Sequence, residues 1–244
     1  MNSRKLSIGF FITGANKGIG KEIAYQMGEN GWTILLGARD ASRGLAATDE
    51  LKTKGIDATY VNIDLQNHET ISAAVNTIKS EHPDLAMLIN NAAIPGDMRK
   101  PGSEFTVNEL REVMETNVFG TFDLTQQLLP TLEANNGRIL NITIPIGMSD
   151  FFNPFAYKTS KAALNAMMQS FAQNFITAEK SLEIFGIMPG GVTTDLNGNM
   201  TGDFMKTVPE AGKLITDIIF DGKNHNSEII NFNGKTADYN GGLF

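Results

Sequence analysis

The chain has 244 residues and no cysteine, with a net charge of −7 at neutral pH and a pI near 5.0. This acidity disfavours nucleic acids and anionic membranes as partners, and the lack of cysteine excludes disulfides and thiol chemistry. No apolar stretch approaches the length that spans a membrane. The N-terminal apolar run ends at Thr13 and is too short for a signal peptide, so we expect a soluble cytoplasmic protein.

Short apolar runs alternate with amphipathic segments along the chain. The apolar runs predict seven strands, at residues 6–12, 32–38, 58–63, 85–90, 137–144, 182–188 and 228–232. Helical periodicity predicts a first helix with Ile19, Ile23 and Met27 on its core face. Further helical segments are predicted at 41–54, 67–81, 105–134 (one long helix or two shorter ones), 156–178 and 209–220.

This alternation indicates an α/β fold in which helices connect parallel strands through right-handed crossovers. The wholly apolar strand at 85–90 is typical of a sheet that is covered on both faces. We therefore expect a single doubly wound, Rossmann-type parallel sheet of about seven strands in one domain, residues 1–244. The segment 193–208 has several glycines and no clear period, so we expect a substrate-binding loop or a mobile lid there.

The first connection between strand and helix carries three glycines, in the sequence FFITGANKGIG at residues 10–20. Gly14 permits a tight turn, Gly18 lets the backbone approach a phosphate, and Gly20 allows the helix to pack closely on the strand. Such a turn presents backbone N–H groups and a helix N-terminus to a pyrophosphate. The spacing is one residue longer than G-x-G-x-x-G, and taken alone it is equally compatible with a plain turn.

Basic residues surround the position where the adenosine ribose of a dinucleotide would lie. Lys17 precedes Gly18, and Arg39 and Arg43 follow the second predicted strand, where an NAD site usually has an acidic residue. Guanidinium groups bind phosphate through two hydrogen bonds, so these cations favour NADP(H) with its 2′-phosphate. The alternative is that they are ordinary solvated surface charges.

Polar residues also follow the third and fourth predicted strands. Asp64 directly follows the third strand, and Asn90 and Asn91 lie at the end of the fourth. The carboxyl ends of neighbouring strands line the crevice where open α/β sheets bind ligands. Turn formation or helix capping would explain the same residues.

Tyr157 and Lys161 are four residues apart in the sequence YKTSK, within a predicted helix. This spacing places them on one helix face, with their Cβ atoms about 5–6 Å apart. An ammonium group nearby stabilises a phenolate and lowers the tyrosine pKa, which suits a general acid for an alkoxide. The pair alone is a weak signal, but beside the glycine turn and the polar strand ends it indicates an oxidoreductase site.

Together, the motifs TGANKGIG, NNAA, METNVFG, YKTSK and PGGVTT resemble the short-chain dehydrogenase/reductase family over nearly the whole chain. The combination of TGANKGIG with ARDASRG more closely resembles its NADPH-dependent carbonyl reductases. The resemblance implies hydride transfer from NADPH to a carbonyl carbon, with Tyr157 protonating the oxygen. It also implies that Lys161 holds the ribose hydroxyls and lowers the pKa of Tyr157, and that Asn117 keeps a water in the proton relay. The implied cofactor contacts are Gly14, Asn16, Lys17, Ile19, Gly20, Arg39, Arg43, Asp64, Leu65, Asn91, Tyr157, Lys161, Val192 and Thr194.

One position departs from the family pattern. The family has a serine thirteen residues before the tyrosine, and Ile144 occupies that position here. Thr143 is the nearest hydroxyl, but adjacent strand residues face opposite sides, so we expect it to point away from the site. Ser149 would reach the site only after a rearrangement of its loop. Loss of a donor to an oxyanion costs on the order of 10²–10³ in rate, although Ile144 is also an ordinary residue for a strand end.

Apolar residues predominate among the candidate substrate contacts, which suits a hydrophobic aldehyde or ketone. These contacts are Ile144, Phe151, Phe152, Leu196 and Met200, with Pro95, Pro154, Met188 and Phe204 as further candidate pocket walls. Ordinary core packing is the alternative for many of them. Two other functions stay open: an NADP-binding protein with little turnover, which Ile144 favours, and a reductase of another acceptor such as an imine.

The three histidines, His68, His82 and His225, lie apart on polar segments, so we expect surface side chains and no metal site. The helical segments 105–134 and 156–178 are apolar on more than one face. In the family these helices commonly form a four-helix interface, so the resemblance implies a homo-oligomer, either a dimer or a tetramer.

Overall fold

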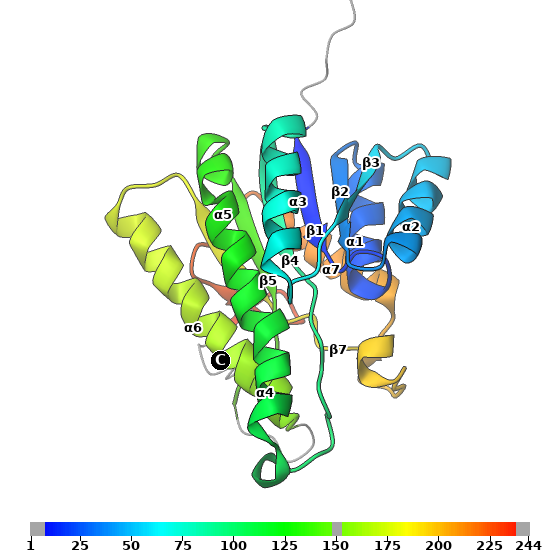
Figure 1. The fold of residues 1–244 in the computed structure, drawn as a ribbon, viewed down its shortest axis with the longest axis vertical. Coiled ribbons are helices and arrows are strands. Elements are labelled where there is room, and N and C mark those ends of the chain that lie inside the picture. The colour runs from blue at the N-terminus through cyan, green and yellow to red at the C-terminus, as the bar shows by residue number, and fades with distance from the viewer. Residues whose placement is uncertain (1–7, 148–152, 238–244) are drawn as a thin grey trace, which may run out of the picture.

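The computed structural model of the protein describes residues 8–147 and 153–237 (Figure 1). An eight-stranded sheet lies at its centre, in the order β10-β9-β6-β5-β4-β1-β2-β3. Its strands are β1 (Gly9–Thr13), β2 (Thr33–Ala38), β3 (Ala58–Asn62), β4 (Leu85–Asn90), β5 (Arg138–Ile142), β6 (Glu183–Ile187), β9 (Ile229–Ile230) and β10 (Thr236–Ala237). Every pairing is parallel except that of β10 with β9. The predicted doubly wound sheet is confirmed, and the sequence missed the eighth strand because two residues are too few to show a period.

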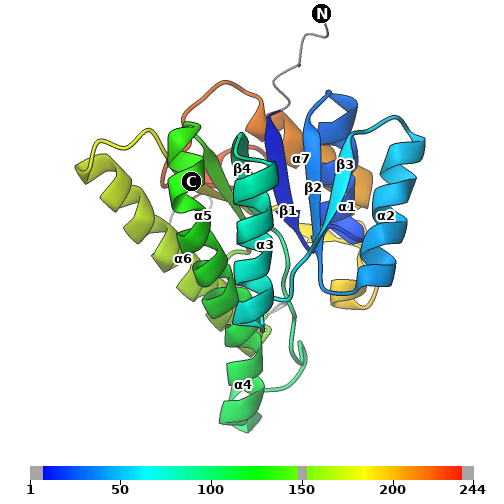
Figure 2. The same cartoon turned by 45° about the horizontal axis from the view of Figure 1, so that its top comes forward.

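Helices cover both faces of this sheet (Figure 2). They are α1 (Gly18–Glu29), α2 (Ala41–Thr53), α3 (His68–Glu81), α4 (Val107–Met114), α5 (Thr121–Ala134), α6 (Phe155–Thr177) and α7 (Val208–Ile219). The core on one face contains side chains of α1, α2 and α7, and the core on the other contains side chains of α3, α5 and α6. Within residues 8–147 and 153–237, no helix has the length and apolar character needed to cross a membrane.

Strand β1 shows how the sequence produces this layering. All five of its residues are buried, with Phe10 and Ile12 in the core on one face and Phe11 in the core on the other. A strand covered on both faces needs a continuous apolar run, which β1 has. Because β1 lies between β2 and β4, the order of the strands reverses there, and the crevice beyond the carboxyl ends of β1 and β4 is the expected ligand position.

The segment predicted to hold one or two helices contains two α-helices joined by a π-helical segment. This segment, η2 (Glu115–Gly120), runs directly from α4 into α5, and a short 3₁₀ turn, η1 (Gly102–Glu104), precedes α4. A Cβ at Gly120 would collide with the carbonyl oxygen of Leu65, so glycine lets the helix meet the loop after β3. π-Helical turns are frequent at functional sites, and η2 carries Asn117.

The predicted loop at 193–208 has more regular structure than its glycine content indicates. Strand β7 (Gly191–Val192) pairs with β8 (Met205–Lys206), and a 3₁₀ turn, η3 (Asp195–Asn197), lies between them. The expectation of an irregular segment is therefore corrected in part, because elements of two or three residues leave no period in a sequence. Figure 1 shows this segment below α1.

Candidate active site

The turn after β1 packs against the loop after β4. Gly14 has a φ of +64°, and a Cβ there would lie 2.9 Å from the Cα of Ala92. Asn91 Nδ2 donates to the carbonyl oxygens of Thr13 (2.9 Å) and Gly14 (3.2 Å). Gly20 leaves room for this amide group, since a Cβ at that position would collide with it. The two loops therefore form one unit at the reversal point of the sheet.

The N-terminus of α1 is open to an anion. Lys17 is its N-cap, with extended backbone geometry and no hydrogen bond from its side chain to the helix. A helix leaves its first N–H groups without partners of its own. At Gly18, where φ is +57°, a Cβ would meet only Thr194 Cγ2, at 3.7 Å, among the described residues. The N–H groups of residues 18–20 thus have no partner within the helix, and Asn16 lies in the same turn, which fits the pyrophosphate of a dinucleotide.

The three cations predicted to bind a 2′-phosphate are all exposed. Lys17 Nζ lies 2.8 Å from Asp195 Oδ2, although the two residues are 178 positions apart. Arg43 Nε lies 3.4 Å from Asp40 Oδ2, and Asp40 is also the N-cap of α2. Two of the cations therefore already have carboxylate partners, and the pairing of Lys17 with Asp195 had no signal in the sequence.

Other predicted cofactor residues lie along the same edge of the sheet. Asp64 Oδ1 accepts a hydrogen bond from Gln66 N (3.1 Å), so this carboxylate shapes its own turn. Leu65 and Val192 are buried. Thr194 is the N-cap of η3 and lies against Gly18. The structure thus places Asp64 and Leu65 beyond the carboxyl end of β3 and Val192 and Thr194 beyond that of β6, with Thr194 beside the glycine turn.

Tyr157 and Lys161 lie near the start of α6, and both are buried, with exposed fractions of 6% and 2%. Lys161 Nζ lies 5.5 Å from the centre of the Tyr157 ring and donates to the carbonyl oxygen of Ile142 (2.7 Å). Burial raises the pKa of Tyr157 above its ordinary value and lowers the pKa of Lys161 to about 8. The expected lowering of the Tyr157 pKa is therefore wrong for this structure, because desolvation of the phenolate outweighs the nearby ammonium. Tyr157 keeps its proton at neutral pH.

Asn117 connects three segments around this pair. Its Oδ1 accepts from Ile94 N (2.8 Å), and its Nδ2 donates to Ile94 O (2.9 Å) and to Ser160 Oγ (3.0 Å). Ser160 Oγ in turn donates to the carbonyl oxygen of Tyr157 (2.7 Å). Both amide hydrogens of Asn117 are used, so a relay water would need another atom of this residue. The side chain fixes η2, α6 and the loop after β4 together.

Ile144 lies half-buried just beyond β5, where the family pattern has a serine. The hydroxyl of Thr143 is used by α6, because its Oγ1 donates to Asn165 Oδ1 (2.7 Å) and both residues are buried. Ser149, Phe151 and Phe152 lie outside the described residues.

The other apolar pocket candidates divide into two groups. Met188 is fully packed in the core beneath α6, so core packing explains it. Leu196 is half-buried, whereas Met200 and Phe204 are 46% and 73% exposed and belong to no core. Core packing therefore does not explain the exposed apolar side chains in the segment from β7 to β8.

Two residues of the site escaped the sequence analysis. Thr13 Oγ1 accepts from the backbone N–H groups of Asn91 (3.1 Å) and Ala92 (3.0 Å), which sets the position of the loop after β4. Ser160 connects Asn117 to Tyr157, as described above. Their positions in the sequence could have identified them as site residues, because Thr13 directly precedes Gly14 and Ser160 directly precedes Lys161.

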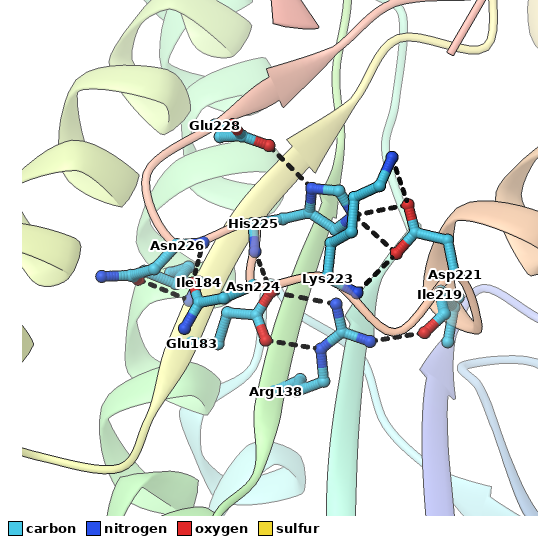
Figure 3. Close-up of polar contacts among 10 residues, drawn as sticks. All are labelled: Arg138, Glu183, Ile184, Ile219, Asp221, Lys223, Asn224, His225, Asn226 and Glu228. Atoms are coloured by element: carbon cyan, nitrogen blue, oxygen red, sulfur yellow. Dashed lines mark hydrogen bonds and ion pairs between the residues drawn. The ribbon is translucent and has the colours of Figure 1, made fainter. Parts of the chain in front are cut away.

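A second polar cluster lies at the opposite ends of the strands, around the amino ends of β5 and β6 (Figure 3). Arg138 begins β5 and Glu183 begins β6, and their side chains pair through Nε–Oε2 (2.7 Å) and Nη2–Oε1 (2.9 Å) contacts. His225 Nδ1 lies 2.7 Å from Glu228 Oε2, and its Nε2 lies 3.1 Å from both carboxylate oxygens of Asp221. This cluster joins the loop after α7 to the starts of β5 and β6.

The expectation of a surface position for His225 is wrong, since only 5% of the residue is exposed. The surrounding segment is polar because its groups bind other parts of the protein, as when Asn226 Oδ1 accepts from Ile184 N (3.0 Å). Within residues 8–147 and 153–237, no group of three His, Asp or Glu side chains is arranged to hold a metal ion.

Residues 10–203 match the protein family described as short chain dehydrogenase. The 3-oxoacyl-acyl-carrier-protein reductase FabG of Staphylococcus aureus (strain N315) is 24% identical over 257 residues, which cover 98% of this chain and 99% of that protein. The 7alpha-hydroxysteroid dehydrogenase of Escherichia coli (strain K12) is 32% identical over 185 residues, which cover 75% of this chain and 71% of that protein.

A similar fold is found in the NADPH-bound carbonyl reductase from chicken fatty liver. The two structures superimpose with a TM-score of 0.83 at 22% identity, over 94% of this chain and 98% of the carbonyl reductase. The family match spans most of the chain and includes the glycine turn, the Asn117 segment and the Tyr157–Lys161 pair. This protein therefore belongs to the short-chain dehydrogenase family of oxidoreductases, which use a nicotinamide cofactor.

Proposed function

We propose that this protein is an NADPH-dependent reductase of apolar aldehydes or ketones, with Tyr157 as the general acid. The observation that carries the proposal is the buried pair of Tyr157 and Lys161. This pair lies beyond the carboxyl ends of the strands, as does the N-terminus of α1. A phenol that keeps its proton at neutral pH is suited to donate it to an oxygen that is becoming an alkoxide.

The choice of cofactor rests on the glycine turn and on the cations beside it. The N–H groups of residues 18–20 would hold the pyrophosphate, and Lys17, Arg39 and Arg43 would hold the 2′-phosphate. The carbonyl reductase from chicken fatty liver is described as NADPH-bound, which supports NADPH as the cofactor of this chain.

The residues of the chain supply the proton and the electrostatic support for reduction. When bound, NADPH supplies a hydride for the carbonyl carbon. Tyr157 Oη donates its proton to the carbonyl oxygen, and the positive charge of Lys161 stabilises the phenolate that remains. The carbonyl oxygen of Ile142 holds Lys161 in place, while Asn117 acts as a positioning residue through Ser160.

An apolar substrate follows from the side chains beside the site. The Ile144 side chain offers no hydrogen-bonding group. Leu196 lies in η3, and Met200 lies three residues after the end of η3. Phe151 and Phe152 stay proposed contacts, although they lie outside the described residues. The relatives, a 3-oxoacyl-acyl-carrier-protein reductase and a 7alpha-hydroxysteroid dehydrogenase, support substrates with large apolar parts.

We also propose that the protein is a homo-oligomer, a dimer or a tetramer. The surface of η2, α5 and α6 exposes Phe119, Phe122 and Ile176, and Phe122 stacks on Phe171 of α6. Exposed apolar side chains that gather on one surface are typical of an interface between proteins. Sedimentation velocity at several concentrations would distinguish a monomer, a dimer and a tetramer.

A second candidate function is NADP binding with little turnover, and the observation that favours it is Ile144 in place of the usual serine. Reduction of an imine is the third candidate, because the proton requirements of that acceptor differ.

One experiment separates these functions. NADPH oxidation is followed with apolar aldehydes, ketones and cyclic imines, using the native chain and Ile144→Ser in parallel. Ile146→Ser, which adds a hydroxyl to a half-buried position in the same loop, is the matched control. Turnover of an aldehyde or ketone by the native chain supports the proposal. Activity in Ile144→Ser alone would favour the NADP-binding protein, and turnover of imines alone would favour the third candidate.

A further inference from the structure

We propose that Asp195 competes with the 2′-phosphate of NADP(H) for Lys17 and so limits the preference of this protein for NADPH over NADH. The inference rests on the proposed cofactor site and gives it a specificity-determining residue. The residue belongs to η3, which the chain order places far from the glycine turn.

The geometry places Asp195 at the mouth of the α1 N-terminus. Lys17 Nζ lies 2.8 Å from Asp195 Oδ2, and both side chains are more than half exposed. The neighbouring residues, Gly18 and Thr194, also lie against each other, with Thr194 Cγ2 3.7 Å from a Cβ placed on Gly18. The ion pair therefore joins the glycine turn to η3 across the side on which an anion would enter.

The carboxylate of Asp195 is ionised and accepts from two donors, Lys17 and Asn199. Thr194 and Asn197 form a capping box around η3, and Asn199 Nδ2 donates to Asp195 Oδ1 (3.2 Å). The hydrogen bonds from Lys17 and Asn199 keep the pKa of Asp195 below its ordinary value. The negative charge is therefore present at neutral pH and held near Lys17.

A phosphate monoester carries a charge of about −1.5 to −2 at neutral pH, so a 2′-phosphate needs cationic partners. To bind the 2′-phosphate, Lys17 has to break its ion pair with Asp195 or contact both anions at once. The Asp195 carboxylate then repels the phosphate. Arg43 is already paired with Asp40, whereas no salt bridge in residues 8–147 and 153–237 involves Arg39. NADH lacks the 2′-phosphate, so the competition for Lys17 affects NADPH alone, whereas repulsion between Asp195 and the pyrophosphate is common to both cofactors.

The test measures dissociation constants for NADPH and NADH by calorimetry, with no substrate present. Asp195→Asn should tighten NADPH binding by about three- to tenfold and change NADH binding by less than about twofold. Asp217→Asn is the matched control, because Asp217 pairs with Lys213 at 2.7 Å in a similarly exposed ion pair on α7. It makes the same change in net charge and should leave both constants unchanged.

Lys17→Met provides the second arm. It should weaken NADPH binding, and Asp195→Asn should give a smaller gain in its presence, because the two side chains act on each other. An unchanged NADPH constant in Asp195→Asn, or an equal change for both cofactors, would overturn the inference and leave the proposed cofactor intact. Failure of NADPH to bind to the native chain and to every variant would refute the proposed cofactor site and this inference with it.

Discussion

Polar clusters at the two ends of the central strands, the amino ends of β5 and β6 and the carboxyl ends of β4 and β5, are built differently. At their amino ends, Arg138 and Glu183 share two hydrogen bonds, and Arg138 Nη1 also donates to the carbonyl oxygen of Ile219 (2.6 Å). His225 is held between two further carboxylates (Figure 3). We call this cluster of Arg138, Glu183, Asp221, His225 and Glu228 the paired edge.

At the carboxyl ends of β4 and β5, polar groups have fewer partners. Asn90 Nδ2 donates to Asn141 Oδ1 (2.9 Å), but Asn90 Oδ1 and Asn141 Nδ2 have no partner within the described part of the chain. Beside them, Lys161 is buried with its ammonium group on the carbonyl oxygen of Ile142. We call Asn90, Asn141, Tyr157 and Lys161 the reactive edge.

The contrast separates stability from chemistry. A buried polar group without a hydrogen-bond partner lowers the free energy of unfolding by about 1–3 kcal/mol. The reactive edge therefore makes the protein less stable than fully paired groups would. A proton donor and a cation that are not already neutralised can instead act on a substrate. Changes at the reactive edge should therefore affect turnover, and changes at the paired edge should affect unfolding.

The largest effect is expected from Tyr157→Phe. It removes the proposed acid without changing the shape of the ring, so turnover should fall by about 10²–10⁴. The dissociation constant of NADPH should change by less than about twofold. Tyr25→Phe on α1 is the control, because the half-buried Tyr25 ring carries a hydroxyl that donates to Glu29 at the surface. Rates are measured by NADPH oxidation and binding by calorimetry. Full activity in Tyr157→Phe would mean that another group donates the proton.

Glu183→Gln should lower the free energy of unfolding by about 1–2 kcal/mol, because it leaves the half-buried Arg138 guanidinium without its counter-charge. Urea denaturation measures this loss, and NADPH oxidation by the folded variant should stay near the native rate. A Glu183→Gln variant with native stability and impaired turnover would contradict the assignment of stability to the paired edge and of turnover to the reactive edge.

The charge of Lys161 should make stability depend on pH. Its pKa is about 8 in the folded protein, below the ordinary value of 10.5, so the unfolded chain binds more protons between these two values. The free energy of unfolding should therefore rise by about 1 kcal/mol per pH unit just above pH 8, and the cost of burying the charge is greatest below it.

Lys161→Met should abolish this rise. Lys158→Met, on a less buried side of the same helix, should retain it. Identical pH profiles for the native chain and Lys161→Met would show that the buried ammonium does not cause the dependence. Urea denaturation between pH 7 and pH 10 provides the comparison.

The smallest effect is expected from Ser160→Ala. Asn117 loses one acceptor and the Tyr157 carbonyl oxygen loses one donor, so kcat should fall by about three- to tenfold. Because Ser160 acts through position, the pH at which the rate changes should not move. A shifted pH profile would instead assign Ser160 to the proton transfer.

The sequence predicted those parts of the molecule that depend on local spacing. Strands β1 to β6 contain short runs of apolar and β-branched residues, and Tyr157 and Lys161 share a helix face because they are four residues apart. The glycine turn follows from the conformations that Gly14 and Gly18 adopt, both with positive φ.

The remainder depends on residues that are distant in the chain. Lys17 meets Asp195 across 178 positions. His225 N donates to Glu183 Oε1, 42 positions away, and the His225 ring lies 5.6 Å from the ring of Phe185. The direction of the Tyr157 pKa shift was missed because spacing reports its neighbour Lys161 but not the burial of both groups. These properties appear only when the sheet has brought its strand ends together.

The most direct measurement of the central claim is transfer of a labelled hydride. The native chain and Tyr157→Phe are incubated with NADPH deuterated at the nicotinamide C4 position and a panel of apolar aldehydes and ketones, and the products are analysed by mass spectrometry. We expect the native chain to form an alcohol with deuterium on the carbinol carbon and Tyr157→Phe to form almost none while still binding NADPH. NADPH binding by the native chain without labelled alcohol from any carbonyl compound would contradict the proposed reductase.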